Sequence, residues 1–223
     1  MGSQLSAEVK PYEYWLRVTL ALEVHVQTAL LDVVHNRNND PSYQGLPDSP
    51  VHLYQYLYQN HYGSFQRLLK KNILKPDQFN LLLPANGQTD SSKWDITLIV
   101  LIIRNCTNIQ PPINGWTTAA ASDVSKGAAV IKSRDIRNWL KHSKIDEVIT
   151  ERQFNAIWEE IKTTLECLDY NNMSRFQALE TDEFLNDNIE EVKTITAKLV
   201  MKEIDQAKKD LLKIFMTEIQ KMG

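Results

Sequence analysis

The chain has 223 residues, of which 43% are hydrophobic and 24% are charged, enough apolar material for a core of its own. Seven glycines and eight prolines are few for a fold with many tight turns, so the composition argues against a β-rich architecture. The net charge of −3 gives no general attraction for nucleic acid. The longest apolar run, Ile96 to Ile103, is far shorter than the roughly 20 residues of a membrane span. We therefore expect a cytoplasmic protein without membrane contact.

Two cysteines, Cys106 and Cys167, lie in apolar helical contexts without the spacing of a metal site. Buried free thiols are expected rather than a disulfide, in keeping with a reducing compartment. No metal and no cofactor are predicted.

Helical periodicity dominates the first 170 residues. Apolar residues recur at steps of three and four from Tyr12 to Asn36, which predicts a long amphipathic helix. The polar stretch up to Pro50 contains three prolines and predicts a loop. Further helices are predicted at residues 51–71, 76–84, 94–106, 122–142 and 150–168.

Local signals mark several helix ends. Ser122-Asp123 is predicted to cap the helix that runs to His142, and Ser143-Lys144 to break it. Thr150 and Gln153 have the spacing of a capping box. The apolar run at 94–106 fits a buried strand or a buried helix by periodicity, and the lack of a strand partner favours the helix.

The C-terminal part predicts a different organisation. We expect a helical domain at residues 1–170, a polar linker or short helix at 171–188, and a long amphipathic helix at 189–223. Apolar residues in the last segment follow the seam pattern of a short coiled coil. This helix is expected to project, to pair with a signalling partner, or to lead into another domain.

Charge is unevenly distributed. Residues 122–144 carry six bases and two acids, for a net charge of +4, whereas residues 145–191 carry 13 acids and three bases, for −10. The basic stretch contains Arg137 and Asn138, followed four positions after Asn138 by His142. Arginine binds phosphate oxygens and histidine moves protons near neutral pH, so these residues are candidates for metal-free RNA cleavage.

A helix end in solvent explains the same residues without chemistry, because basic side chains favour the last turn of a helix. At 100° per residue, Asn138 and His142 lie 40° apart, whereas Arg137 and His142 lie 140° apart. A site built from two copies across a two-fold axis would bring Arg137 and His142 together better than one helix can.

Other candidates have plainer explanations. His25 and His35 are expected at the surface or as satisfied interior histidines. Tyr54, Tyr58 and Tyr62 could stack bases, but core packing is the preferred interpretation. The Arg104-Asn105 pair is interpreted as a helix end that could face the site.

Several ordered motifs resemble one family. The sequence around Arg137, Asn138 and His142 resembles the signature of HEPN (higher eukaryotes and prokaryotes nucleotide-binding) domains. Flanking motifs resemble the HEPN-like domain of the DAZ-interacting E3 ubiquitin ligase group, between Tyr14 and Leu168. The motifs are Trp94-Asp95-Ile96-Thr97-Leu98, Pro112 with Gly115-Trp116, Ser122-Asp123, Ile136-Arg137-Asn138 with His142-Ser143, and Gln153-Phe154 with Trp158.

The resemblance implies an all-α, HEPN-like bundle of five or six helices with a long C-terminal helical extension. It also implies a metal-independent endoribonuclease in which Arg137, Asn138 and His142 form a composite site in a homodimer. Arg134 and Lys141 are expected to bind the single-stranded RNA substrate. The rivals are a non-catalytic homotypic interaction module in innate-immune or ubiquitin signalling, and RNA binding without cleavage.

Overall fold

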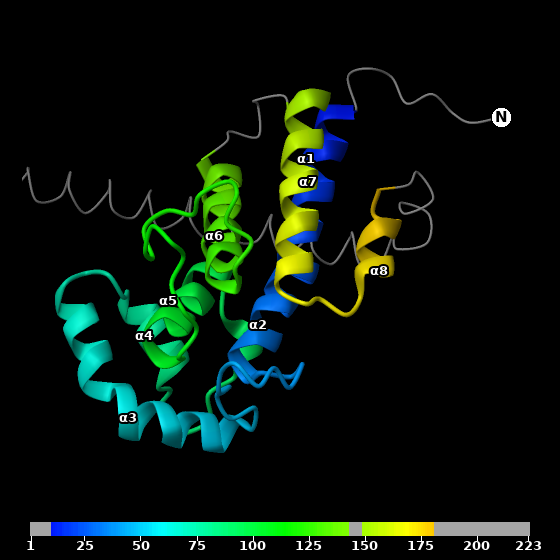
Figure 1. Cartoon of the computed structure of the whole chain (residues 1–223). Helices are drawn as coiled ribbons and strands as arrows, with labels where there is room; N and C mark the ends of the chain where they lie inside the picture. Colours follow the sequence, from blue (N-terminus) through cyan, green and yellow to red (C-terminus); the bar gives the residue numbers. More distant parts are fainter. Residues whose placement is uncertain (1–9, 143–148, 181–223) are drawn as a thin grey trace, which may run out of the picture. The chain divides into compact units, whose positions relative to one another are not determined.

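Helices make up all the regular secondary structure in residues 10–142 and 149–180, the part of the chain that the computed structural model describes (Figure 1). The predicted all-α class is confirmed. The chain divides into two compact units, residues 1–176 and 177–223, and residues 177–180 of the second are described. The elements are α1 (Lys10–Leu20), the π-helical segment η1 (Ala21–Val26), α2 (Gln27–His35), α3 (Pro50–Lys70), α4 (Pro76–Leu82), the short helical turn η2 (Ser91–Lys93), α5 (Ile96–Cys106), α6 (Lys126–His142), α7 (Glu151–Cys167) and α8 (Met173–Ala178).

The first predicted helix is one continuous helix formed by α1, η1 and α2. The backbone keeps right-handed helical angles at both junctions. The helix ends at Asn36, whose φ of 50° is left-handed, a conformation that Asn adopts more readily than most residues. The N–H groups of Asn36 and Arg37 bind carbonyls of the last turn, so the helix end predicted from the sequence is confirmed.

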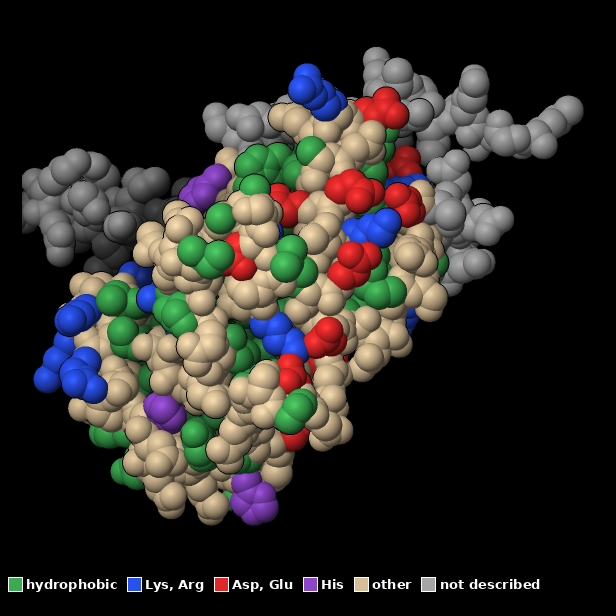
Figure 2. Space-filling view, viewed as in Figure 1, with side chains coloured by type: hydrophobic (Ala, Val, Ile, Leu, Met, Phe, Trp, Pro, Cys, Tyr) green, Lys and Arg blue, Asp and Glu red, His purple; other side chains and the backbone are tan. Residues whose placement is uncertain are grey.

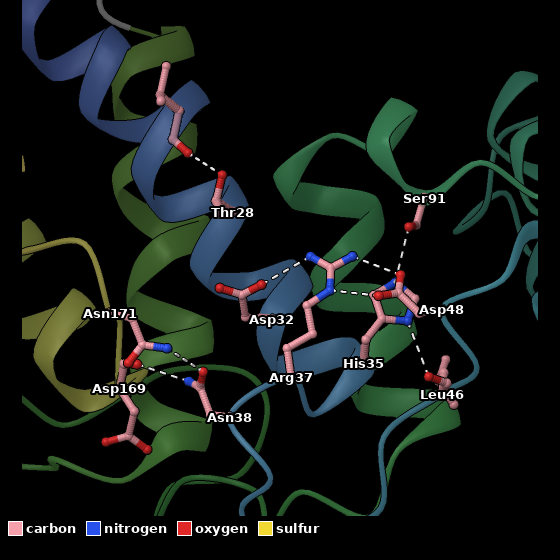
Figure 3. A network of polar contacts seen from close by, with 11 residues as sticks. Thr28, Asp32, His35, Arg37, Asn38, Leu46, Asp48, Ser91, Asp169 and Asn171 are labelled. Carbon is pink, nitrogen blue, oxygen red and sulfur yellow. Dashed lines mark hydrogen bonds and ion pairs between the residues drawn. The ribbon is translucent and has the colours of Figure 1, made fainter. Parts of the chain in front are cut away.

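Polar contacts fasten the loop between α2 and α3 to the rest of the unit (Figure 3). Arg37 donates to the two carboxylate oxygens of Asp48 at 2.8 and 2.7 Å. Buried His35 contacts the carbonyl oxygen of Leu46 at 3.2 Å and the hydroxyl of Ser91 at 3.0 Å. His35 is therefore a satisfied interior histidine, as predicted.

Helix α3 lies at one end of the unit and buries little of its surface. Leu53, Leu57 and Phe65 are its buried residues. The core packing expected of its tyrosines is wrong for Tyr58 and Tyr62, which are 51% and 37% exposed. The buried positions recur at the helical period, but they are leucines and a phenylalanine, and the tyrosine stripe lies on a neighbouring face.

Helix α5 is the centre of the core and confirms the helical interpretation of the apolar run. It packs against α2 and α6. Asp95 caps its first turn by accepting the N–H of Leu98 at 2.8 Å. Burial raises the pKa of the Cys106 thiol to about 12. Both cysteines are free, as predicted, but the burial expected of both is wrong for Cys167, which is partly exposed. The buried residues of α5 are Ile96, Leu98, Ile99, Val100, Ile102, Ile103 and Cys106.

Helix α7 packs against α1, η1 and α6, with Trp158 buried at its centre. Thr150 and Gln153 form the predicted capping box at its start. Phe176 stacks on Trp158 with ring centroids 4.7 Å apart. The Nδ1 of buried His25 lies 2.8 Å from the Tyr170 hydroxyl, so this histidine is also a satisfied interior residue.

The start of α6 differs from the prediction. Ser122-Asp123 does not cap it, because the helix begins at Lys126 and Ser125 accepts the N–H of Ala128 at 3.2 Å. The Asp123 carboxylate instead accepts the N–H groups of Ile113 and Ser125 at 3.0 and 2.9 Å. These bonds hold the pKa of Asp123 below the usual range and close the loop between Ile113 and Ser125.

Some predictions lie outside the described residues. The break at Ser143-Lys144 and the long helix at 189–223 are among them, while α8 occupies part of the expected linker. Among the described helices, none is long and apolar enough to cross a membrane.

Candidate functional site

The candidate residues lie on the polar side of α6, opposite its packed face. The first half of α6 is buried in the core through small and branched apolar side chains, and Ile136 continues this buried face. Arg137 and Asn138 follow at the rim and are half-buried, and Lys141 and His142 are exposed in the last turn. The amphipathic period of the helix thus determines which of these side chains can reach a ligand.

Arg137 is held between two helices. Its Nη2 donates to the Asp95 carboxylate at 3.0 Å, and its Nη1 donates to the Asn138 side-chain oxygen at 3.2 Å. Because Asp95 also caps α5 with its other oxygen, one carboxylate links the start of α5 to the candidate arginine. Asp95 was not among the residues predicted for the site, although an Asp immediately before an apolar run is a recognisable helix cap.

His142 is the last residue of α6 and is exposed. In the part of the chain that the structure describes, no hydrogen bond or ion pair joins His142 to Arg137 or Asn138. Helix geometry places Asn138 and His142 about 6 Å apart along the axis on one face, with Arg137 turned well away from His142. The fold therefore brings Arg137 and Asn138 together and leaves His142 presented to solvent.

Arg134, predicted to bind substrate, is engaged with its own chain. Its guanidinium donates to the carbonyl oxygens of Trp116 and Thr117 at 3.4 and 2.8 Å and to Asp135 at 2.7 Å. It thus fixes the loop between α5 and α6, which contains Trp116 and Thr117, to α6. By contrast Lys141, the other predicted substrate contact, is exposed.

Arg104 is a further cation on α5, the helix that packs against α6. It lies in the last turn of α5 and is exposed. Partial burial, and then the charge of Arg134, hold its pKa below the usual range.

A family model described as DZIP3/hRUL138-like HEPN matches residues 50–196, more than half of the chain. The chain is 29% identical over 112 residues to the E3 ubiquitin-protein ligase DZIP3 of Mus musculus, which covers 44% of this chain. It is 28% identical over 111 residues to the E3 ubiquitin-protein ligase DZIP3 of Homo sapiens, which covers 49% of this chain.

Each of these matches spans 9% of the relative's own length. No solved structure matches. The matched residues include α6 with Arg137, Asn138 and His142, and also Asp95 at the start of α5. The resemblance predicted from the sequence is confirmed, and the chain belongs to the DZIP3/hRUL138-like HEPN family.

Proposed function

We propose that α6 carries the site of a metal-independent endoribonuclease, completed when two copies of the chain bring their α6 ends together. The observation that supports this most directly is the anchoring of Arg137 by Asp95 and Asn138, one turn before an exposed His142. A preorganised cation loses little freedom when it binds a phosphate, which is what transition-state stabilisation requires.

Arg137 keeps donors for a phosphate in this arrangement. A guanidinium has five N–H donors, and the contacts to Asp95 and Asn138 use one each on Nη2 and Nη1. About three donors remain for phosphate oxygens. Asp95 therefore orients the group without exhausting it.

The reaction that fits these groups needs no external nucleophile. The 2′-oxygen of the RNA forms a bond to phosphorus while the bond from phosphorus to the 5′-oxygen breaks. One His142 takes the proton of the 2′-hydroxyl, and the partner's His142 gives a proton to the departing 5′-oxygen. The products are a 2′,3′-cyclic phosphate and a 5′-hydroxyl, and DNA is excluded because it lacks the 2′-hydroxyl.

The test is cleavage of single-stranded RNA by the purified chain in EDTA. His142→Ala and Arg137→Ala should each lower the cleavage rate by about a hundredfold or more. Arg152→Ala, at an exposed position on α7, is the matched control and should cleave like the wild type. Retained cleavage in both site variants would refute the site.

A second function has its own supporting observation. The guanidinium of Arg134 donates to loop carbonyls and to Asp135, and the guanidinium of Arg137 donates to Asp95. Arginines held by their own chain in this way also suit a rigid, non-catalytic interaction module. The relatives are named as ubiquitin ligases, so homotypic assembly in ubiquitin or innate-immune signalling, or RNA binding without cleavage, is the alternative. A folded dimer that leaves varied RNAs intact would favour it.

A further inference from the structure

Helix α3 is long but buries few of its side chains. It spans 21 residues, and its buried side chains are Leu53, Leu57 and Phe65. Its strongest packing is against the short helix α4. Its other side chains are half-buried or exposed, and the exposed ones are available to a ligand.

One of these faces carries a ladder of aromatic rings. The ring centroids of Tyr54 and Tyr58 are 5.9 Å apart with planes 15° from parallel, and those of Tyr58 and Tyr62 are 5.1 Å apart. The Gln66 side chain donates to the Tyr62 hydroxyl at 2.7 Å and orients that ring. Phe79 of α4 continues the ladder at 6.2 Å. Tyr58 and Tyr62 are exposed at the middle of the ladder.

The ladder ends among positive charges. Residues 49–76 contain four Lys or Arg and no Asp or Glu, in a chain whose net charge is −3. All four bases are exposed, and Figure 2 shows Lys and Arg side chains gathered where α3 meets α4, with no acidic side chain beside them on this face. They are Arg67, Lys70, Lys71 and Lys75.

We infer that Tyr54, Tyr58 and Tyr62, together with these four bases, form a binding platform for single-stranded nucleic acid. Bases stack on the exposed rings, and the phosphates run toward the α3–α4 turn. Tyrosines four residues apart rise about 6 Å along the helix, which is comparable with the step between bases in an extended strand. Stacking uses the face of any base, so the platform selects single strands rather than a sequence.

The composition of the face favours nucleic acid over a protein partner. Besides His52 and the basic residues Arg67 and Lys70, the exposed polar side chains of α3 are amides, namely Gln55, Gln59, Asn60 and Gln66. The exposed aliphatic residues Val51, at the start of α3, and Ile73, in the turn after α3, are far apart along the chain and form no apolar centre. A protein interface needs a contiguous, desolvated core, whereas separate rings beside four exposed cations, with Asp77 the one acid among residues 49–77, suit a polyanion with planar bases.

This inference does not depend on cleavage at α6. Arg137 and His142 belong to α6, and the platform belongs to α3 and the α3–α4 turn. Single-stranded DNA lacks the 2′-hydroxyl, so it reports binding without being cleaved by the proposed reaction. Failure of one proposal is therefore separable from failure of the other.

The experiment is fluorescence anisotropy of the full chain with labelled single-stranded DNA and RNA of about 16 nucleotides. The RNA arm uses His142→Ala in EDTA so that the strand stays intact. Tyr58→Ala/Tyr62→Ala should weaken binding of both strands about tenfold or more, and Tyr58→Phe/Tyr62→Phe, which keeps the rings, should bind like the wild type.

A pair of double variants tests the contribution of the basic residues to the platform. Lys70→Gln/Lys71→Gln should reduce the slope of log Kd against log salt by about 1.4, the value for two contacts to single-strand phosphates. Arg152→Gln/Lys162→Gln on α7 removes the same charge elsewhere and should leave the slope unchanged. Comparison of these two double variants still tests binding at the platform if Tyr58→Ala/Tyr62→Ala does not fold.

Unchanged binding of DNA and RNA by the alanine double variant would overturn the proposal. So would a wild-type chain that binds neither strand. If the same variant instead abolished self-association in sedimentation, the face would be a protein interface. His142→Ala should lose RNA cleavage and keep DNA binding, while the ladder variants should lose DNA binding.

Discussion

The carboxylate of Asp95 joins Arg137 to the first turn of α5. One oxygen accepts the Leu98 N–H at 2.8 Å and the other pairs with the guanidinium at 3.0 Å. Both contacts are part-buried, and the Asp95 side chain is 42% exposed, so solvent screens the ion pair. Capping is then the larger contribution of Asp95 to stability, and the ion pair contributes chiefly to orientation of the arginine.

This division predicts different effects for two variants. Asp95→Asn keeps a capping oxygen and should unfold at nearly the wild-type urea concentration, whereas Asp95→Ala should lose about 1 kcal/mol of stability. Both should lower RNA cleavage, because Arg137 loses its anchor. Urea denaturation and initial cleavage rates measure the two effects separately. Wild-type cleavage by a folded Asp95→Asn chain would show that the anchor is dispensable.

Alanine substitutions at two glycines, Gly127 and Gly63, test the packing of the loop before α6. A Cβ at Gly127 would lie 2.3 Å from the Gln110 carbonyl oxygen, so Gly127→Ala must displace backbone and should cost about 1–3 kcal/mol in chemical denaturation. Gly63, in the exposed part of α3, has nothing within 4 Å of such an atom. Gly63→Ala should stabilise the chain by about 0.5–1 kcal/mol. Equal effects of the two changes would contradict this packing.

The buried His25 makes stability depend on pH. Burial, and then the charge of Arg175, lower its pKa from 6.5 to about 4. The unfolded chain therefore binds a proton at a higher pH than the folded chain does. The contribution of neutral His25 is complete above about pH 6.5 and is lost as the pH falls toward 4, at up to about 1.4 kcal/mol per pH unit.

Urea titrations between about pH 4.5 and 7 measure this slope. His25→Gln should flatten it, leaving the part due to His35 and His61, whose pKa values burial also lowers. If His25→Gln kept the wild-type slope, His25 would not be its source.

The two thiols should react in order. Cys106 is buried and its pKa is raised to about 12, whereas Cys167 is partly exposed. Since the thiolate is the reactive form, iodoacetamide at neutral pH should modify Cys167 first and Cys106 only after denaturation. Peptide mass spectrometry assigns the sites, and Cys167→Ser should leave a native chain that resists the reagent. Rapid labelling of Cys106 in that variant would contradict its burial.

Local signals explain how much of the fold was predictable. The capping box of Thr150 and Gln153 and the helix end at Asn36 involve neighbours within a turn, so their positions follow from sequence. The start of α6 did not follow, because Asp123 turns to the N–H of Ile113, ten residues away. A side chain with two possible partners is assigned correctly only when the chain's path is known.

The sequence by itself determined that the chain is all-α, that Arg137, Asn138 and His142 share one helix, and that this helix belongs to a HEPN-like domain. Tertiary structure decided that Asp95 anchors Arg137, that Arg134 donates to loop carbonyls, and that Tyr58 and Tyr62 of α3 are exposed. Helical period and capping depend on residues a few positions apart. Ion pairs and exposure depend on which segments pack together, and Asp95 and Arg137 are separated by 42 positions.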